Sequence, residues 1–249
     1  MLGWVPVEYI CLAAGQGRRF GRLGLYLQKC MYPIGLRPFL ELSLRNLLSS
    51  RELDRERDRL TLVIGHHGEQ IRDYFGTSLE GLAITYLEQP RQLGTGHALA
   101  LLYREHRPSQ PVIAWLADLY VSKALFEAVR SHREANLLTL AAGPVGESGD
   151  VLVSTAGELV TRAWRGAGDL YDIGLWKLAP EVLRRMTDQL EGEYRMLPNL
   201  QRAIERGTRV GFVRASEWIH LGGTQPSAEK NVRAVVTKLL ELEAPDDTL

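Results

Sequence analysis

The chain has little cysteine, no net charge and no long apolar run, and each absence narrows its possible roles. The two cysteines, Cys11 and Cys30, lack metal-ligand spacing, and the apolar surroundings of Cys11 favour a structural role in a reducing compartment. Thirty basic residues balance thirty acidic ones, which argues against a general nucleic-acid binder. No uncharged apolar run approaches the ~20 residues that a membrane helix needs.

The two ends of the chain also favour a simple organisation. The first ten residues include Glu8 and lack a long apolar core, so no signal peptide is evident, and we expect a cytoplasmic protein without a membrane partner. Apolar residues at helical spacing predict a C-terminal helix over 226–249. The sequence shows no repeat, low-complexity tract or convincing linker, so we expect one domain over 1–249.

Short apolar runs that are typical of buried strands alternate with helical patterns. Expected strands cover 9–12, 60–65, 82–87, 111–116, 137–141 and 209–213, and expected helices cover 38–48, 71–75, 98–105, 122–136, 180–191 and 197–205. Glycines interrupt 151–178, which predicts an antiparallel flap or sheet extension, and the charged segment 53–59 predicts a solvated connection. This order predicts an α/β fold: a Rossmann-like three-layer α/β/α sandwich around a mostly parallel sheet.

A glycine-rich turn follows the first expected strand. It reads Leu12-Ala13-Ala14-Gly15-Gln16-Gly17-Arg18-Arg19, and Lys29 follows a little later. Small residues let a backbone turn sharply, and backbone N–H groups together with basic side chains suit a polyphosphate. An ordinary strand-to-helix turn with solvated arginines would give the same pattern, so the loop alone leaves both interpretations open.

Two later features also lie where expected strands end. The third strand leads into the turn Gln92-Leu93-Gly94-Thr95-Gly96-His97, and Asp118 lies at the end of the fourth. Ligands of open parallel sheets gather beyond the carboxyl ends of the strands. Asp118 is therefore a candidate ligand-binding carboxylate.

Together these motifs resemble those of the sugar-1-phosphate nucleotidyltransferases. Members usually read LAAGxGTR and have a proline-lysine pair downstream; here the loop reads LAAGQGRR and Gln28 precedes Lys29. The segment 88–98 is similar to the family's nucleobase-binding segment, and its wording QLGTGHA is closest to the N-acetylglucosamine-1-phosphate uridylyltransferases. The segment 63–71 is also similar to the family.

The resemblance implies that a nucleoside triphosphate and a sugar-1-phosphate give a nucleotide-sugar and pyrophosphate. The sugar phosphate oxygen attacks, so catalysis consists of positioning and charge neutralisation rather than a side-chain nucleophile. Residues 1–122 would bind the nucleotide and 123–225 the acceptor, within the nucleotide-diphospho-sugar transferase fold. The implied partners are a pyrimidine triphosphate (UTP, CTP or dTTP) and a phosphorylated sugar, and a homo-oligomer stays open.

The resemblance also assigns roles to single residues. Arg19 would hold the β- and γ-phosphates, Lys29 would bridge the sugar phosphate and the α-phosphate, and Asp118 would ligate Mg²⁺. The nucleotide contacts that it implies are Leu12, Ala13, Ala14, Gly15, Gly17, Gln89, Gly94 and Thr95. The expected substrate contacts in the acceptor half are Gly149 and Asp172, and Asp172 stands where an asparagine often contacts the sugar.

The last family motif is altered in this chain. A second metal ligand, aspartate or asparagine, normally follows a tryptophan; here the motif reads Trp218-Ile219-His220, so His220 occupies the ligand position, and Ala117 replaces the glycine before Asp118. Imidazole suits Zn, Cu, Fe or Ni better than Mg²⁺. Three explanations stay open: an unusual acceptor phosphate with single-ligand Mg²⁺, a different divalent metal held through His220, or a non-catalytic nucleotide-binding regulatory homologue. The alternative enzyme is a cytidylyl- or guanylyltransferase for a non-sugar phosphate acceptor.

Overall fold

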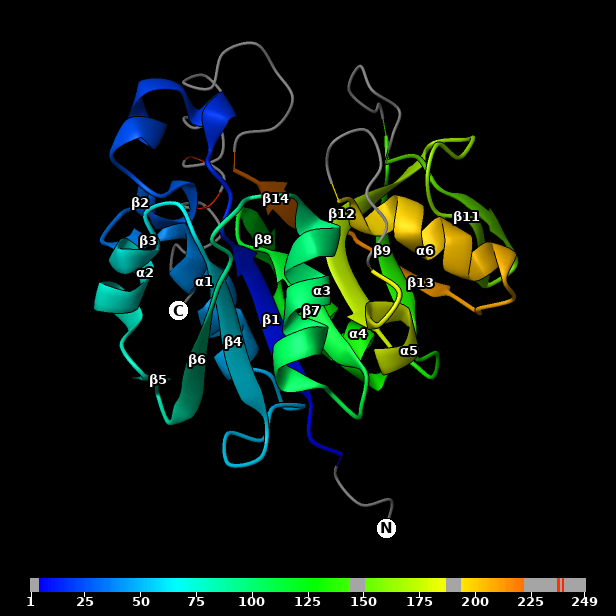
Figure 1. Ribbon diagram of the computed structural model, residues 1–249, viewed down its shortest axis with the longest axis horizontal. Helices are drawn as coiled ribbons and strands as arrows, with labels where there is room; N and C mark the ends of the chain where they lie inside the picture. Colours follow the sequence, from blue (N-terminus) through cyan, green and yellow to red (C-terminus); the bar gives the residue numbers. More distant parts are fainter. Residues whose placement is uncertain (1–4, 144–150, 187–193, 222–236, 238, 240–249) are drawn as a thin grey trace, which may run out of the picture.

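The computed structural model describes residues 5–143, 151–186, 194–221, 237 and 239. Within these ranges a ten-stranded sheet runs through the molecule with helices on both faces (Figure 1). Its strand order is β10 (Ser154–Ala156), β11 (Leu159–Arg162), β13 (Gly211–Arg214), β9 (Leu137–Ala142), β12 (Leu170–Leu178), β7 (Val112–Leu116), β1 (Glu8–Ala13), β4 (Arg59–Ile64), β6 (Leu82–Glu88) and β5 (Ser78–Leu79). All but β5, β11 and β12 run in one direction, which confirms the mostly parallel sheet.

Helices cover both faces of the sheet, so its central strands are apolar on both sides. One face packs against α1 (Phe39–Leu48), α2 (Gly68–Phe75) and α4 (Lys123–Ser131), and the other against α3 (Thr95–His106), α5 (Pro180–Leu183) and α6 (Met196–Glu205). In β1, Tyr9 and Cys11 join the first core while Ile10 joins the second. The predicted three-layer sandwich is confirmed.

The strand β12 differs most from expectation. We expected a flap or sheet extension over 151–178; β10 and β11 do extend the sheet, but β12 lies in its middle, antiparallel to both β7 and β9. The pattern of short, interrupted strands that the sequence showed corresponds to a register shift between Asp172 and Trp176 within this one strand. Gly174 adopts a φ of 96° at this irregularity, a backbone conformation that other residues rarely adopt. The glycine therefore marks an irregular buried strand and not the end of one.

Smaller differences concern element ends and the segment 53–59. The helix α3 begins at Thr95, inside the expected glycine turn, and α4 ends at Ser131. Asp58 is buried and forms an ion pair with Arg130, so the interpretation of 53–59 as a solvated connection was wrong for this residue. The segment in which a helix was expected over 180–191 is described only as far as residue 186, and within it α5 ends at Leu183. Most of the helix expected over 226–249 lies outside the described residues.

Short elements complete the carboxyl end of the sheet. They are the 3₁₀ segments η1 (Arg18–Leu25) and η2 (Lys29–Met31), the pair β2 (Pro33–Ile34) and β3 (Arg37–Pro38), and the pair β8 (Leu119–Val121) and β14 (Trp218–His220). A small third core of Phe20, Ile34, Phe39, Leu42, Ile219, Leu221 and Leu239 joins them. Among the described residues, no helix is long and apolar enough to cross a membrane.

Candidate active site

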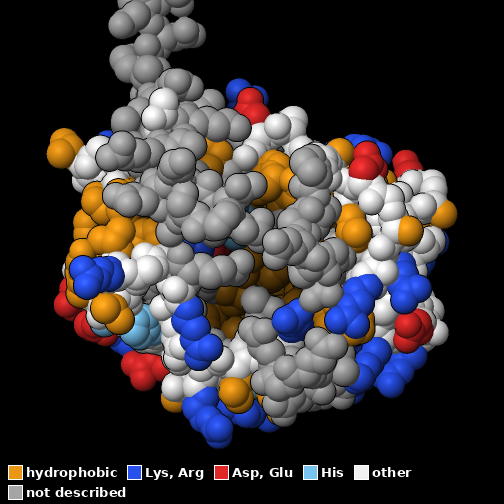
Figure 2. All heavy atoms as spheres, turned by 90° about the horizontal axis from the view of Figure 1, so that it is seen from above, with side chains coloured by type: hydrophobic (Ala, Val, Ile, Leu, Met, Phe, Trp, Pro, Cys, Tyr) orange, Lys and Arg blue, Asp and Glu red, His pale blue; other side chains and the backbone are white. Residues whose placement is uncertain are grey.

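The carboxyl ends of β1, β4, β6 and β7 meet at one end of the molecule, the upper end in Figure 1. Figure 2 looks onto this end, which is hollowed near its middle and carries Lys and Arg side chains along part of its rim. The loop after β1, the turn after β6 and the segment after β7 all lie here. The fold therefore brings together the three motifs that the sequence singled out.

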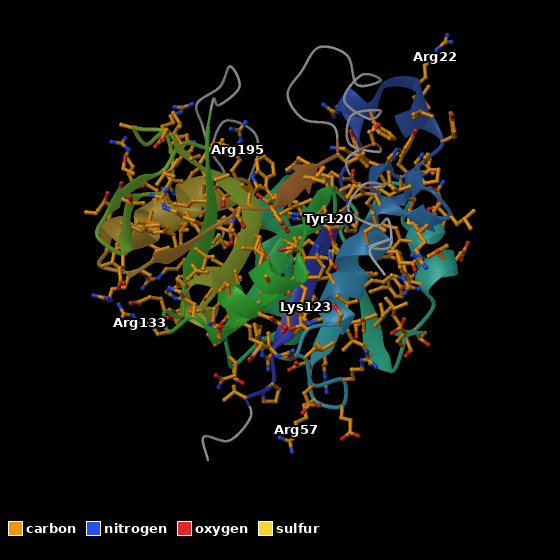
Figure 3. All side chains as sticks on the ribbon, turned by 180° about the vertical axis from the view of Figure 1, so that it is seen from behind. Arg22, Arg57, Tyr120, Lys123, Arg133 and Arg195 are labelled. Atoms are coloured by element: carbon orange, nitrogen blue, oxygen red, sulfur yellow. The ribbon has the colours of Figure 1, made fainter. Side chains whose placement is uncertain are left out.

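The loop after β1 borders an open cavity. Gly15 and Gln16 are exposed, and Gly17 directly precedes η1. A cavity of about 470 Å³ is lined by Gln16, Gly17, Arg18, Gly21, Gly24, Leu25 and His66. Figure 3 shows Arg22 pointing away from the body of the molecule. Arg19 is the second residue of the same 3₁₀ segment, but its side chain lies outside the description.

The segment after β7 holds a charged cluster of Lys29, Asp118 and His220. The Lys29 Nζ lies 2.5 Å from the Asp118 Oδ2, and the two side chains are 12% and 24% exposed. The His220 Nδ1 lies 3.7 Å from the same oxygen. The antiparallel pair β8 and β14 places His220 opposite Leu119, directly beside Asp118. This strand pairing thus brings His220 to Asp118, and Lys29 reaches the same carboxylate from η2.

This cluster sets the charge state of Asp118. Burial disfavours the charged carboxylate and would raise its pKa, but the nearby His220 and Lys29 outweigh burial and hold the pKa of Asp118 below its ordinary value. The carboxylate is therefore ionised at neutral pH. Lys29 neutralises it directly.

The glycine turn after β6 is fastened to the segment that precedes α6. The Tyr194 N–H donates to the Leu93 carbonyl (2.6 Å) and the Gly96 N–H to the Tyr194 carbonyl (2.8 Å). The Met196 N–H donates to the Thr95 Oγ1 (3.1 Å). A Cβ on Gly96 would lie only 2.9 Å from the Arg195 carbonyl oxygen, so the glycine permits this close approach. The turn joins the two expected halves of the site.

Gln89 is buried behind this turn. Its Nε2 donates to the Gly94 carbonyl (3.2 Å) and to the His97 Nδ1 (2.8 Å). Burial and the charges of Arg104 and Arg91 lower the pKa of His97, which keeps the ring neutral and able to accept this bond. Gln89 therefore shapes the turn through its amino group.

The expected acceptor contacts are described only in part. Asp172 is buried, and both of its oxygens accept from the Trp176 Nε1, at 2.8 and 3.0 Å. Burial raises the pKa of Asp172 to about 7. Gly149 lies outside the described residues.

Gln28 is a residue that the sequence presented only as a departure from the family pattern. It is 3% exposed, and its Nε2 lies within hydrogen-bond distance of the carbonyls of Ala13 (2.8 Å), Gly15 (3.2 Å) and His66 (2.9 Å). A polar side chain in place of a proline, directly before Lys29, was the signal that could have identified it.

Comparison with known proteins agrees with this geometry. Residues 9–167 match the MobA-like NTP transferase domain. The chain belongs to this family. A curated relative, the bifunctional protein GlmU of Cupriavidus pinatubonensis, is 28% identical over 235 residues, which cover 87% of this chain and 49% of the relative. The chain thus spans about half the length of the curated relatives that it matches.

Solved structures extend the likeness of the fold. UDP-glucose pyrophosphorylase from Acinetobacter baumannii has a TM-score of 0.78 at 16% identity, covering 97% of this chain and 95% of that one. A UDP-glucose pyrophosphorylase complexed with UDP-glucose has a TM-score of 0.75 at 16% identity, covering 95% of this chain and 100% of that one. This chain therefore shares the fold of sugar nucleotide pyrophosphorylases.

The donor set of this member of the MobA-like NTP transferase family limits the metals that it could bind. In the part of the chain that the structure describes, no group of three or more His, Cys, Asp or Glu side chains could hold a metal ion. Asp118 offers one carboxylate beside one imidazole. Mg²⁺ keeps several waters and takes the remaining oxygens from phosphates, so one carboxylate is compatible with it. Asp118 and His220 alone do not form a closed metal site in which the protein supplies every ligand.

Proposed function

We propose that this chain is a nucleotidyltransferase that joins a nucleoside triphosphate to a sugar-1-phosphate and releases pyrophosphate. The observation that carries the proposal is the meeting of Lys29 and Asp118 beside the signature loop at the carboxyl end of the sheet. A fixed cation and an ionised carboxylate beside a small-residue loop suit phosphoryl chemistry, which needs positioning and charge neutralisation. Membership of the MobA-like NTP transferase family supports the same reaction class.

The roles proposed for the chain's own residues follow from their positions. Backbone N–H groups of the loop around Gly15 and Gly17 would bind phosphate oxygens, and Arg19 would neutralise the leaving pyrophosphate. Lys29 would exchange its ion pair with Asp118 for the phosphates at the reacting centre. Because Lys29 sits on a flexible stem and carries a compact charge, it suits this exchange.

We infer that Asp118 would hold Mg²⁺ once Lys29 turns to the phosphates, since its carboxylate is ionised and a quarter exposed. Mg²⁺ would supply charge neutralisation at the phosphates when bound. His220 then acts mainly by lowering the pKa of Asp118, because imidazole is a poor ligand for Mg²⁺. A different divalent metal, held jointly by Asp118 and His220, is the alternative that the 3.7 Å separation supports.

The proposed partners are a pyrimidine triphosphate and a phosphorylated sugar. The likeness of the turn after β6 to the uridylyltransferase segment, and the fold shared with a pyrophosphorylase that binds UDP-glucose, favour UTP. On the acceptor side, the rings of Tyr171 and Trp218 lie 5.8 Å apart and those of Trp218 and His220 6.3 Å apart. This aromatic row beside Asp118 suits the apolar face of a sugar ring. A cytoplasmic location and a homo-oligomer remain part of the proposal.

A second candidate is a nucleotide-binding homologue without turnover. The observation that favours it is His220, which replaces a carboxylate or amide ligand of the resembling enzymes and places an imidazole 3.7 Å from Asp118. In that case the loop would bind triphosphate while the acceptor half served another purpose.

Pyrophosphate release tests the proposal directly. The wild-type protein is incubated with Mg²⁺, each of UTP, CTP, dTTP, ATP and GTP, and a panel of sugar-1-phosphates. We expect release with at least one pair, and a loss of roughly 100- to 1000-fold in kcat/KM for Lys29→Met, as when one group that stabilises transition-state charge is removed. Lys123→Met, at the start of α4 and outside the cluster, is the matched control and should keep full activity.

The outcomes separate the candidates. Triphosphate binding without pyrophosphate release from any pair would support the homologue without turnover, and absence of triphosphate binding would overturn both. His220→Asp tests the metal: unchanged metal preference would show that His220 is not a ligand.

A further inference from the structure

Gln28 connects two loops of the site through its side chain. Its amide nitrogen carries two hydrogens and lies 2.8 to 3.2 Å from three carbonyl oxygens, those of Ala13, Gly15 and His66. The Ala13 carbonyl lies at the end of β1, the Gly15 carbonyl in the loop after it, and the His66 carbonyl in the segment after β4. Gln28 is 3% exposed; its bond to Ala13 is buried, where an unmet carbonyl is costly, and its bonds to Gly15 and His66 are partly buried.

The direction of these carbonyls fixes the direction of the loop's donors. In a trans peptide, C=O and N–H point to opposite sides. The Gly15 carbonyl points to Gln28, so the N–H of Gln16 points away from it, and the Ala13 carbonyl orients the N–H of Ala14 in the same manner. Gln16 is exposed and lines the 470 Å³ cavity. The hydrogen bonds from Gln28 therefore orient the loop's N–H donors, as anion-binding loops require.

The backbone of Gln28 is held as well. Its N–H donates to the Oε1 of Gln70, and the Nε2 of Gln70 donates to the Tyr26 carbonyl, both at 2.8 Å. The two carbonyls before Tyr26, those of Gly24 and Leu25, meet the Nε2 atoms of His66 (3.1 Å) and His67 (3.2 Å). The segment that leads into Lys29 is thus fastened to the start of α2 at consecutive positions.

We propose that Gln28 is a positioning residue whose side-chain amide holds the phosphate-binding loop and Lys29 in register. Its φ of −63° is the value that proline adopts, so the backbone matches the proline-lysine pattern of the resembling family. This chain keeps that backbone and adds an amide that grips the loop directly. The proposal rests on the proposed function, because it concerns how the same site receives a triphosphate.

Three variants test the role. Gln28→Met keeps the length of the side chain but removes both N–H donors. Gln28→Glu keeps the shape but replaces the donor NH₂ group with an acceptor oxygen. Asn136→Leu is the matched control: Asn136 is also a buried amide, bonded to the Ala179 N–H and the Arg209 carbonyl. It lies at the start of β9, away from the carboxyl end of β1.

The first measurement needs no ligand. Trypsin cuts after Arg18 or Arg19 faster when the loop leaves its folded geometry, and mass spectrometry identifies the cut. We expect both Gln28 variants to be cut there about tenfold faster than wild type, as for a lost set of buried hydrogen bonds, and Asn136→Leu to be cut there at the wild-type rate. Wild-type cleavage rates in both Gln28 variants would overturn the proposal.

The second measurement separates positioning from stability. For the Gln28 variants we expect the Kd of UTP to rise about tenfold, whatever the loss in Tm. We expect the Kd of the sugar phosphate to rise less, because only Lys29, of the two elements that Gln28 holds, would contact it. An equal rise for both ligands, or a rise in Asn136→Leu of similar size, would overturn the positioning role. If wild-type protein binds no triphosphate, the proposed function fails, and the trypsin result still decides whether Gln28 holds the loop.

Discussion

We expect the two glycine-rich turns to respond differently to the same substitution, glycine to alanine. At Gly96, a Cβ would lie 2.9 Å from the Arg195 carbonyl oxygen, 3.0 Å from its carbonyl carbon and 3.1 Å from the Tyr194 carbonyl oxygen. All three are backbone atoms, so no side chain can rotate away. At Gly15, a Cβ would meet nothing within 4 Å, and the residue does not adopt a positive φ.

These distances predict a loss of stability at Gly96 and a loss of triphosphate binding at Gly15. For Gly96→Ala, overpacking against a backbone predicts a loss of about 1–3 kcal/mol in the free energy of unfolding. For a chain of this length that lowers Tm by roughly 2–12 °C. For Gly15→Ala we expect unchanged stability, or a gain of about 0.4–1 kcal/mol from a less flexible unfolded chain. The added methyl would instead obstruct a phosphate, weakening triphosphate binding by roughly 5- to 150-fold.

Urea unfolding and titration calorimetry with UTP measure the two effects on the same preparations. The reasoning is refuted at Gly96 if the alanine variant unfolds with the wild-type free energy. At Gly15, a loss of stability above about 1 kcal/mol would mean that the loop is packed and not open. An unchanged Kd for UTP in Gly15→Ala would remove this residue from the binding surface.

Two further predictions concern buried charges. Arg130→Met leaves the fully buried Asp58 carboxylate without its cation, which should lower the free energy of unfolding in urea by about 3–5 kcal/mol. Arg133→Met, at an exposed arginine labelled in Figure 3, is the control. A loss below about 1 kcal/mol in Arg130→Met would contradict the reasoning. Burial raises the pKa of Asp172 from 3.8 to about 7, so between these values the folded state retains a proton that the unfolded chain releases. The bound proton therefore contributes to the free energy of unfolding; the contribution is complete below pH 3.8 and is lost as the pH rises through about 7. Asp172→Asn should therefore unfold with a flatter pH dependence and exceed wild type near pH 8 by up to about 4 kcal/mol, and an unchanged slope would contradict the pKa.

The sequence predicted the parts of the fold that depend on local pattern. Apolar runs of four to six residues identified β1, β4, β7 and β9 because most of their side chains are buried on both faces. They also identified β6, in which buried Leu82 and Ile84 alternate with exposed residues. The position of β12 could not be read in this way. A glycine and an aspartate interrupt its apolar run, and its place between β7 and β9 is decided by pairings with strands far away in sequence.

The same limit applies to the candidate site. A resemblance could propose Lys29 and Asp118, but their contact spans 89 positions and follows from the fold. The bond between Met196 and the Thr95 hydroxyl spans 101 positions, and no local pattern announces it. Asp58 looked solvated because its partner Arg130 lies 72 positions away. Buried polar pairs of this kind can be identified only from the three-dimensional structure.

The place of β12 has a consequence for recombining this chain with its relatives. A cut after residue 122 divides the proposed nucleotide-binding half from the acceptor half, yet β12 supplies the neighbour of β7. The excised first half would present Val112–Leu116, an apolar strand, as an unpaired sheet edge, and such edges promote aggregation. A chimaera or split protein that exchanges the nucleotide half should therefore carry Leu170–Leu178 with it, although that strand is encoded some fifty residues downstream of the cut.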